Sequence, residues 1–124
     1  MDPMDIFETL EFNQDWVELG IITPEKLKRL EAEWAKGEDT NTEHYRWRAF
    51  LDFMESKGVL DENTAKALYN LGANDPDWAM GGSIMAEILR RKDCPNDLLE
   101  RAAKSDRKFL RKIAKERIEA QVEG

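Results

Sequence analysis

The stretch Asn74-Asp75-Pro76-Asp77-Trp78 carries the pattern that decides the fold class of this chain. Aspartate is a preferred N-cap, and proline suits the first turn of a helix because the N–H that it lacks has no intrahelical partner there. We therefore expect a helix to begin at Pro76 with Asp75 as its cap. The same pairing of a capping side chain with proline occurs at Asp2-Pro3 and Thr23-Pro24.

Outward from this stretch, capping residues and glycines divide the chain into about seven predicted helices. No alternating run of β-branched residues predicts a strand. Apolar residues recur at helical spacing, so we expect an all-α fold in which helical hairpins pack as an irregular bundle. The Gly81-Gly82 pair predicts close packing against a neighbouring helix, or a kink. The expected helices cover residues 3–19, 24–36, 43–57, 62–72, 76–92, 96–104 and 107–121.

The last four predicted helices contain two similar copies at an offset of 31 residues. In each copy a short helix ends, an aspartate caps the next helix, and an aromatic residue follows three positions later. The matching pairs are Leu68 and Leu99, Gly72 and Ala103, Asp75 and Asp106, and Trp78 and Phe109. Over residues 62–121 this pattern resembles the HEAT-like and leucine-rich-variant helical hairpin repeats, although Met80 stands where such repeats usually carry arginine.

The resemblance implies a short array of hairpins, each burying its apolar side against the next and leaving a surface for a partner. An irregular helical bundle is the alternative. By length we predict a single domain over residues 1–124, with an acidic helical part over residues 1–60 and the two repeat-like helix pairs over residues 61–124.

Charge is distributed unevenly along the chain, whose net charge is −7. Residues 1–62 carry 16 acidic and 7 basic side chains, whereas residues 63–124 carry 10 acidic and 12 basic ones. The acidic total disfavours non-specific binding to nucleic acid or to an anionic membrane. No apolar run is long enough to span a bilayer, and the N-terminus lacks the features of a signal peptide, so we expect a cytoplasmic protein.

Histidine and cysteine each occur once, as His44 and Cys94, which restricts the chemistry open to the chain. A zinc site needs three or four ligands at short spacings, and one cysteine permits no internal disulfide. Signatures of Ser-His-acid or Cys-His catalysis, of a calcium loop and of a glycine-rich phosphate loop are missing from the sequence. We therefore predict no catalytic residue, no metal and no cofactor.

One acidic stripe lies within the first predicted helix. Four carboxylates follow at spacings of three and four residues, which place them on one face of a helix, with apolar residues on both sides. Such a stripe is either a solvated face or a docking surface for a basic protein. The predicted partner-binding residues are Glu8, Glu11, Phe12, Asp15, Glu18 and Leu19.

The last predicted helix has the opposite charge, with basic residues that recur every four positions. They could bind anionic groups such as phosphates, although cations near a helix C-terminus also stabilise the helix dipole. The residues concerned are Arg107, Arg111, Lys112 and Lys115. Pairing of acidic and basic ends between copies, which gives a homo-oligomer, is a third alternative.

Size, acidity and the lack of catalytic groups together favour a non-enzymatic protein-binding module. We expect an adaptor, or an immunity or inhibitor protein of bacterial or phage type, that engages a basic protein partner through its acidic helix face. The alternative function is nucleic-acid binding through the basic last helix.

Overall fold

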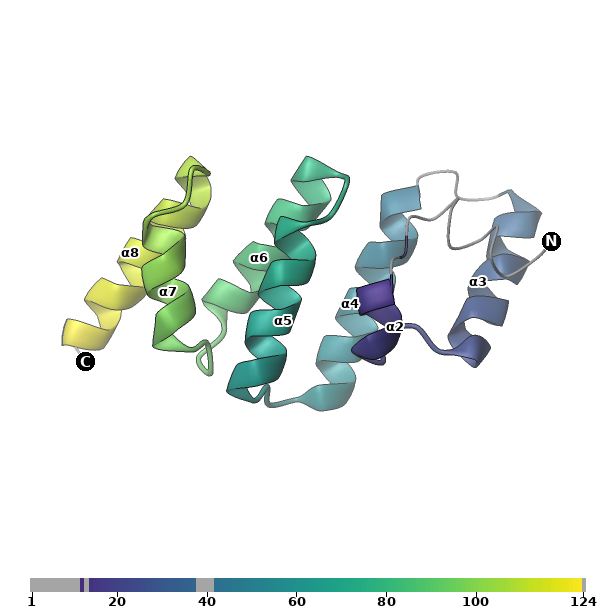
Figure 1. Cartoon of the computed structure of the whole chain (residues 1–124), viewed down its shortest axis with the longest axis horizontal. Helices are drawn as coiled ribbons and strands as arrows, with labels where there is room; N and C mark the ends of the chain where they lie inside the picture. Colours follow the sequence, from purple (N-terminus) through teal and green to yellow (C-terminus); the bar gives the residue numbers. More distant parts are fainter. Residues whose placement is uncertain (1–11, 13, 38–41, 124) are drawn as a thin grey trace. The chain divides into compact units, whose positions relative to one another are not determined.

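The computed structural model describes residue 12, residues 14–37 and residues 42–123 of the chain (Figure 1). Within these residues the chain forms seven α-helices and no strand, which confirms the predicted all-α class. The helices are α2 (Gln14–Glu18), α3 (Pro24–Lys36), α4 (Thr42–Lys57), α5 (Glu62–Ala73), α6 (Trp78–Arg90), α7 (Asn96–Ala103) and α8 (Lys108–Glu123).

Side-chain caps set the starts of several helices, and the cap at Thr23 is one that the sequence predicts. The hydroxyl of Thr23 accepts the backbone N–H of Lys26 at 3.2 Å at the start of α3. The carboxylate of Asp61 accepts the N–H of Thr64 at 3.2 Å at the start of α5. Each cap satisfies a backbone donor that has no partner within its helix. At the other end of α3, Gly37 adopts a left-handed conformation with φ of 68°, which a side chain would disfavour.

The start of α6 differs from the prediction. Asp77, and not Asp75, is the N-cap, because its side chain accepts the N–H of Met80 at 2.8 Å and the helix begins at Trp78. Asp75 instead accepts the N–H of Asp77 at 2.8 Å and so orders the turn before the helix. Both aspartates can cap, and the turn that Asp75 makes moves the helix start by two residues.

The first predicted helix is also shorter than expected. Phe12 lies outside any helix, and α2 spans only Gln14–Glu18. The prediction of one continuous helix over residues 3–19 is therefore wrong, and residues 1–11 lie outside the described residues. The acidic stripe cannot extend unbroken from Glu8 to Glu18 along one helix.

The chain divides into two compact units, Met1–Gly58 and Val59–Gly124. The first unit holds α2, α3 and α4 around a core that includes the fully buried Trp16. Helices α3 and α4 contact each other through Trp34 and Tyr45, whose rings meet edge to face at 5.9 Å, and through an ion pair of 2.7 Å between Arg48 and Glu33. The division falls close to residue 60, where the acidic part of the sequence gives way to the repeat.

In the second unit α5 pairs with α6 and α7 pairs with α8, and α6 also packs against α8 (Figure 1). The backbones of α5 and α6 meet at two glycines. A Cβ atom on Gly81 would lie 2.2 Å from the carbonyl oxygen of Gly72, and one on Gly72 would lie 2.8 Å from the oxygen of Gly81. The close approach predicted for the Gly81-Gly82 pair is thereby confirmed. Most apolar side chains of α6, such as Ile84, are buried, whereas Trp78 at its first position is exposed.

Contacts between the two hairpins join positions that are 31 residues apart. Lys66 pairs with Asp97 at 3.2 Å, and Arg101 donates to the side-chain oxygen of Asn70 at 2.6 Å. The rings of Trp78 and Phe109 meet with centroids 6.4 Å apart. Equivalent positions of the two sequence copies are therefore stacked in space, as in an array of structural repeats.

Candidate binding surface

The acidic residues of the first unit form a smaller exposed surface than the sequence suggests. Asp15 and Glu18 are exposed on α2, and Leu19 is partly exposed. Phe12, expected on an open apolar border, is only 5% exposed and packs edge to face against Trp16 at 5.2 Å. Phe12 is therefore a core residue and contributes no contact area to a partner.

The rest of that predicted surface is limited. Val17 on α2 is 38% exposed and lies between the two acidic positions in the sequence. Glu8 and Glu11 lie outside the described residues. The described part of the acidic face thus consists of Asp15, Val17 and Glu18 on the short helix α2, and of Leu19 in the turn that follows it.

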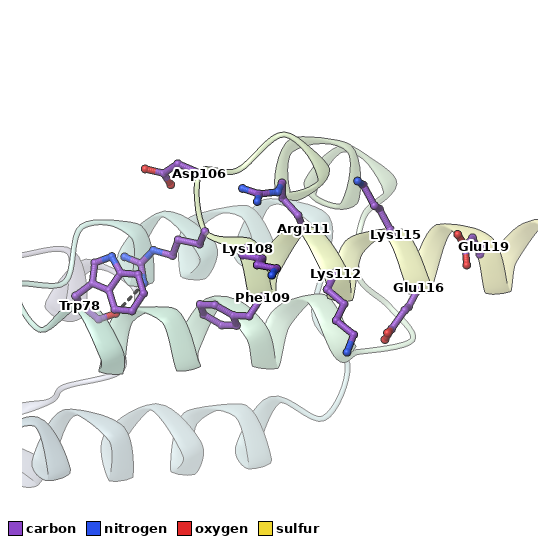
Figure 2. Close-up of a pocket in the computed structure, with 10 residues that line it drawn as sticks. Trp78, Asp106, Lys108, Phe109, Arg111, Lys112, Lys115, Glu116 and Glu119 are labelled. Atoms are coloured by element: carbon purple, nitrogen blue, oxygen red, sulfur yellow. Dashed lines mark hydrogen bonds between the residues drawn. The ribbon is translucent and has the colours of Figure 1, made fainter.

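A larger candidate surface lies along α8. A hollow of about 910 Å³ runs beside this helix and includes the first residue of α6 (Figure 2). It brings together all four of the predicted anion-binding residues. We call it the basic groove, and its lining residues are Trp78, Asp106, Arg107, Lys108, Phe109, Arg111, Lys112, Lys115, Glu116 and Glu119.

Two aromatic side chains form the apolar part of the basic groove. Trp78 is 65% exposed and Phe109 is 39% exposed, which is unusual for such large apolar side chains. Figure 2 shows them near the start of α8, with Lys112 and Lys115 farther along the same helix. The groove therefore has an aromatic end and a basic flank.

Arg107 is fixed against the exposed indole. Its guanidinium lies 4.4 Å from the centre of the Trp78 ring, and its Nη1 donates to the carbonyl oxygen of Trp78 at 2.7 Å. Gly82 makes room for this arrangement, because a Cβ atom there would lie 2.8 Å from both Arg107 Nη1 and the ring of Phe109. The stack keeps the basic and aromatic groups in fixed positions before any ligand arrives.

Among the described residues, the cations of the basic groove form no ion pair with the carboxylates that line it. In the described part of the chain, the ion pairs do not include Arg107, Arg111, Lys112 or Lys115. Arg111 instead donates to the backbone oxygen of Ser105 at 2.8 Å, a neutral acceptor. Five cationic and three carboxylate side chains line the groove, so it is locally positive within a chain of net charge −7.

Sequence reasoning found the basic residues but missed the aromatic end of the groove. The four-residue spacing on α8 was a sufficient signal for the cations. Trp78 stood out in the sequence only as a repeat position matched to Phe109. Its exposure depends on how α6 packs against α8, and the role of Gly82 depends on the same packing.

The two residues considered for catalysis, His44 and Cys94, lie outside the basic groove. Burial raises the pKa of Cys94 to about 11, so its thiol stays protonated at neutral pH and is a weak nucleophile. His44 is exposed near the start of α4 in the first unit. Among the described residues no group of three or more His, Cys, Asp or Glu side chains is placed to hold a metal ion.

None of the described helices has the length and the apolar composition required to cross a membrane. No family model, no curated protein and no solved structure matches the chain. The resemblance to HEAT-like hairpin repeats stays a prediction from the sequence.

Proposed function

We propose that this chain is a non-enzymatic protein-binding module whose basic groove docks an acidic, amphipathic segment of a partner protein. The observation that supports this most strongly is Trp78, which stays 65% exposed beside cations that lack an acidic partner. Tryptophan and arginine are the residue types most enriched at the centres of protein interfaces. We further propose that residues 62–121 form a HEAT-like array, a type of fold that binds partners through its exposed helices.

The size of the groove suits a short helical or extended segment. From Phe109 to Glu119 the groove follows α8 for about 15 Å, at roughly 1.5 Å per residue. An amphipathic helix of about three turns covers that length and can place leucine or phenylalanine against the aromatic end. Its acidic residues would then face Lys112 and Lys115.

Covering the indole accounts for a large part of the expected affinity. Burial of roughly 150 Å² of apolar surface at Trp78 contributes up to about 4 kcal/mol at 25 cal/mol per Å². The cations of Lys112 and Lys115 mainly raise the rate of association and the specificity. Trp78 is therefore the expected hot spot, and the lysines set the charge preference.

A protein segment fits the groove better than nucleic acid does. Three carboxylates, those of Asp106, Glu116 and Glu119, line the same surface. The many phosphates of a polyanion such as RNA would be repelled by these carboxylates. The net charge of −7 would also repel it at long range. A short acidic segment carries few charges and can place them selectively.

The proposal is tested by fluorescence anisotropy with a labelled peptide in which leucines recur every three or four residues and glutamates lie between them. The wild-type chain should bind this peptide and reject a matched peptide in which lysine replaces every glutamate. Lys112→Glu combined with Lys115→Glu should abolish this preference, whereas Lys92→Gln, which removes an exposed cation outside the groove, should not. Preference for a thymidine oligonucleotide over the acidic peptide would contradict the proposal.

A second candidate function is retained because the two described carboxylates of α2, on Asp15 and Glu18, are exposed next to the 38% exposed Val17. On this account α2 engages a basic protein partner, as the sequence predicts. The wild-type chain would then capture the lysine-containing peptide that the basic groove rejects, and Asp15→Lys with Glu18→Lys should weaken that capture. If that double substitution changes no affinity, α2 is only a solvated face.

A further inference from the structure

A second hollow, of about 620 Å³, shares Trp78, Asp106 and Arg107 with the basic groove. We call it the Tyr69 hollow. Three cations and one carboxylate line it, together with a tyrosine and small or apolar side chains. Its lining residues are Tyr69, Ala73, Trp78, Met85, Arg101, Lys104, Ser105, Asp106 and Arg107.

Two guanidinium groups in this hollow are held in place by neutral acceptors. Arg101 Nη1 donates to the side-chain oxygen of Asn70 at 2.6 Å, and Arg107 Nη1 donates to the carbonyl oxygen of Trp78 at 2.7 Å. Each group also lies over an aromatic ring, Arg101 at 4.9 Å from the Tyr69 centroid and Arg107 at 4.4 Å from that of Trp78. The two side chains are thus positioned without being neutralised.

Each guanidinium has five N–H donors, and these contacts use only part of them. Among the described residues, no carboxylate lies at ion-pair distance from Arg101, Lys104 or Arg107. A planar fork of donors matches two oxygens of one anion and favours a bidentate contact. The hollow therefore offers unused N–H donors to an oxyanion of a ligand.

The phenol of Tyr69 interacts electrostatically with both guanidiniums. Burial raises the pKa of its phenol, and the charges of Arg101 and Arg107 oppose that rise. Both guanidiniums thus lie near enough to the phenol to act on it. At neutral pH the hydroxyl remains protonated and can donate a hydrogen bond to an anion.

We propose that the Tyr69 hollow binds a phosphomonoester group on the docked partner segment, with Arg101 and Arg107 as the forked donors and Lys104 as the third cation. This inference rests on the proposed function, since the same segment would place its apolar side chains in the basic groove. A phosphoserine carries a charge of about −1.5 to −2 and three acceptor oxygens, which suits three cations better than a carboxylate does. The carboxylate of Asp106 leaves the hollow with an excess of positive charge.

The test compares two acidic amphipathic peptides that differ only in one phosphoserine. The wild-type chain should bind the phosphorylated peptide at least ~10-fold more tightly. Arg101→Gln should remove this ratio while leaving the affinity for the unphosphorylated peptide unchanged, and Arg101→Lys should restore part of it. Lys92→Gln, outside both hollows, should keep the full ratio. Equal affinities for the two peptides, or a ratio that survives Arg101→Gln, would overturn the inference.

A second measurement separates this inference from the proposed function. Inorganic phosphate alone should shift the side-chain Nε–H signals of Arg101 and Arg107 in NMR spectra, and Arg101→Gln should remove the shift at Arg107. No shift at millimolar phosphate would overturn the inference. If the unphosphorylated peptide still binds through Trp78, the proposed function stands while the phosphate site fails. Tighter binding of a 5′-phosphorylated oligonucleotide than of the phosphopeptide would assign the site to nucleic acid instead and so overturn the proposal.

Discussion

Replacing Gly81 with alanine would place a methyl group 2.2 Å from the carbonyl oxygen of Gly72, where α5 and α6 touch. The obstacle is backbone and not the end of a flexible side chain, so the two helices would have to separate by about 1 Å. Such overpacking typically costs about 1–3 kcal/mol, and a contact this short with a backbone oxygen belongs at the upper end of that range, near about 3 kcal/mol. The gain of about 1 kcal/mol that alanine brings to a helix interior opposes this cost.

Gly82→Ala is the matched control, because it is the same substitution at the next position of α6. There the atoms nearest to the new Cβ would be Arg107 Nη1 and the ring of Phe109, each at 2.8 Å. Both are ends of side chains that can move aside, so the free energy of unfolding should change by less than about 1 kcal/mol. Displacing Arg107 and Phe109 should nevertheless weaken peptide binding.

Urea denaturation of both variants tests this reasoning. We expect Gly81→Ala to lower the free energy of unfolding by about 2 kcal/mol, which for a chain of this size corresponds to a fall in Tm of roughly 5–10 °C. Gly82→Ala should retain the stability of the wild-type chain and bind the peptide more weakly. Equal stability of Gly81→Ala and wild type, or equal losses in both variants, would refute the packing described for α5 and α6.

Two further predictions concern the turn between α6 and α7. Arg91 lowers the pKa of Asp93 to about 2, and the N–H of Leu60 adds to this by donating to the same carboxylate at 2.8 Å. The ionised carboxylate should therefore stabilise the fold fully above about pH 4, and this stabilisation should be lost as the pH falls toward 2. The stability of Asp93→Asn, followed by acid titration, should not show this loss. An acid profile of Asp93→Asn identical to that of the wild-type chain would contradict the prediction. The thiol of Cys94, with a pKa of about 11, should react with a disulfide reagent at pH 8 only as fast as the chain unfolds; rapid reaction of the folded chain would contradict its burial.

Local chemistry explains which helices could be predicted from the sequence. The caps at Thr23 and Asp61 act on N–H groups three residues away, so the residues that decide them are adjacent in the sequence. The start of α6 was predicted less well because Asp75 and Asp77 flank the same proline and each accepts a backbone N–H. Phe12 was misassigned because its helical spacing with Trp16 also suits a residue outside the helix that packs onto it.

In the candidate site too, features set by local spacing could be predicted from the sequence, and features set by helix packing could not. Arg107, Arg111 and Lys115 recur with the helical period, so their shared surface could be predicted from the sequence. The exposed indole of Trp78 and the need for glycine at position 82 depend on the contact between α6 and α8. The 31-residue offset paired Trp78 with Phe109 but carried no information about how far either ring reaches into solvent.

The most direct test of the account follows the backbone amides and the Trp78 indole N–H by NMR while the glutamate-leucine peptide is added to the whole chain. The Trp78 indole signal and the amide signals around Phe109 and Lys112 should shift together and saturate. Trp78→Ala should then weaken binding by about 2 kcal/mol, or ~30-fold. Saturable binding that leaves the α8 signals and the Trp78 indole unchanged would contradict the docking surface proposed for this chain.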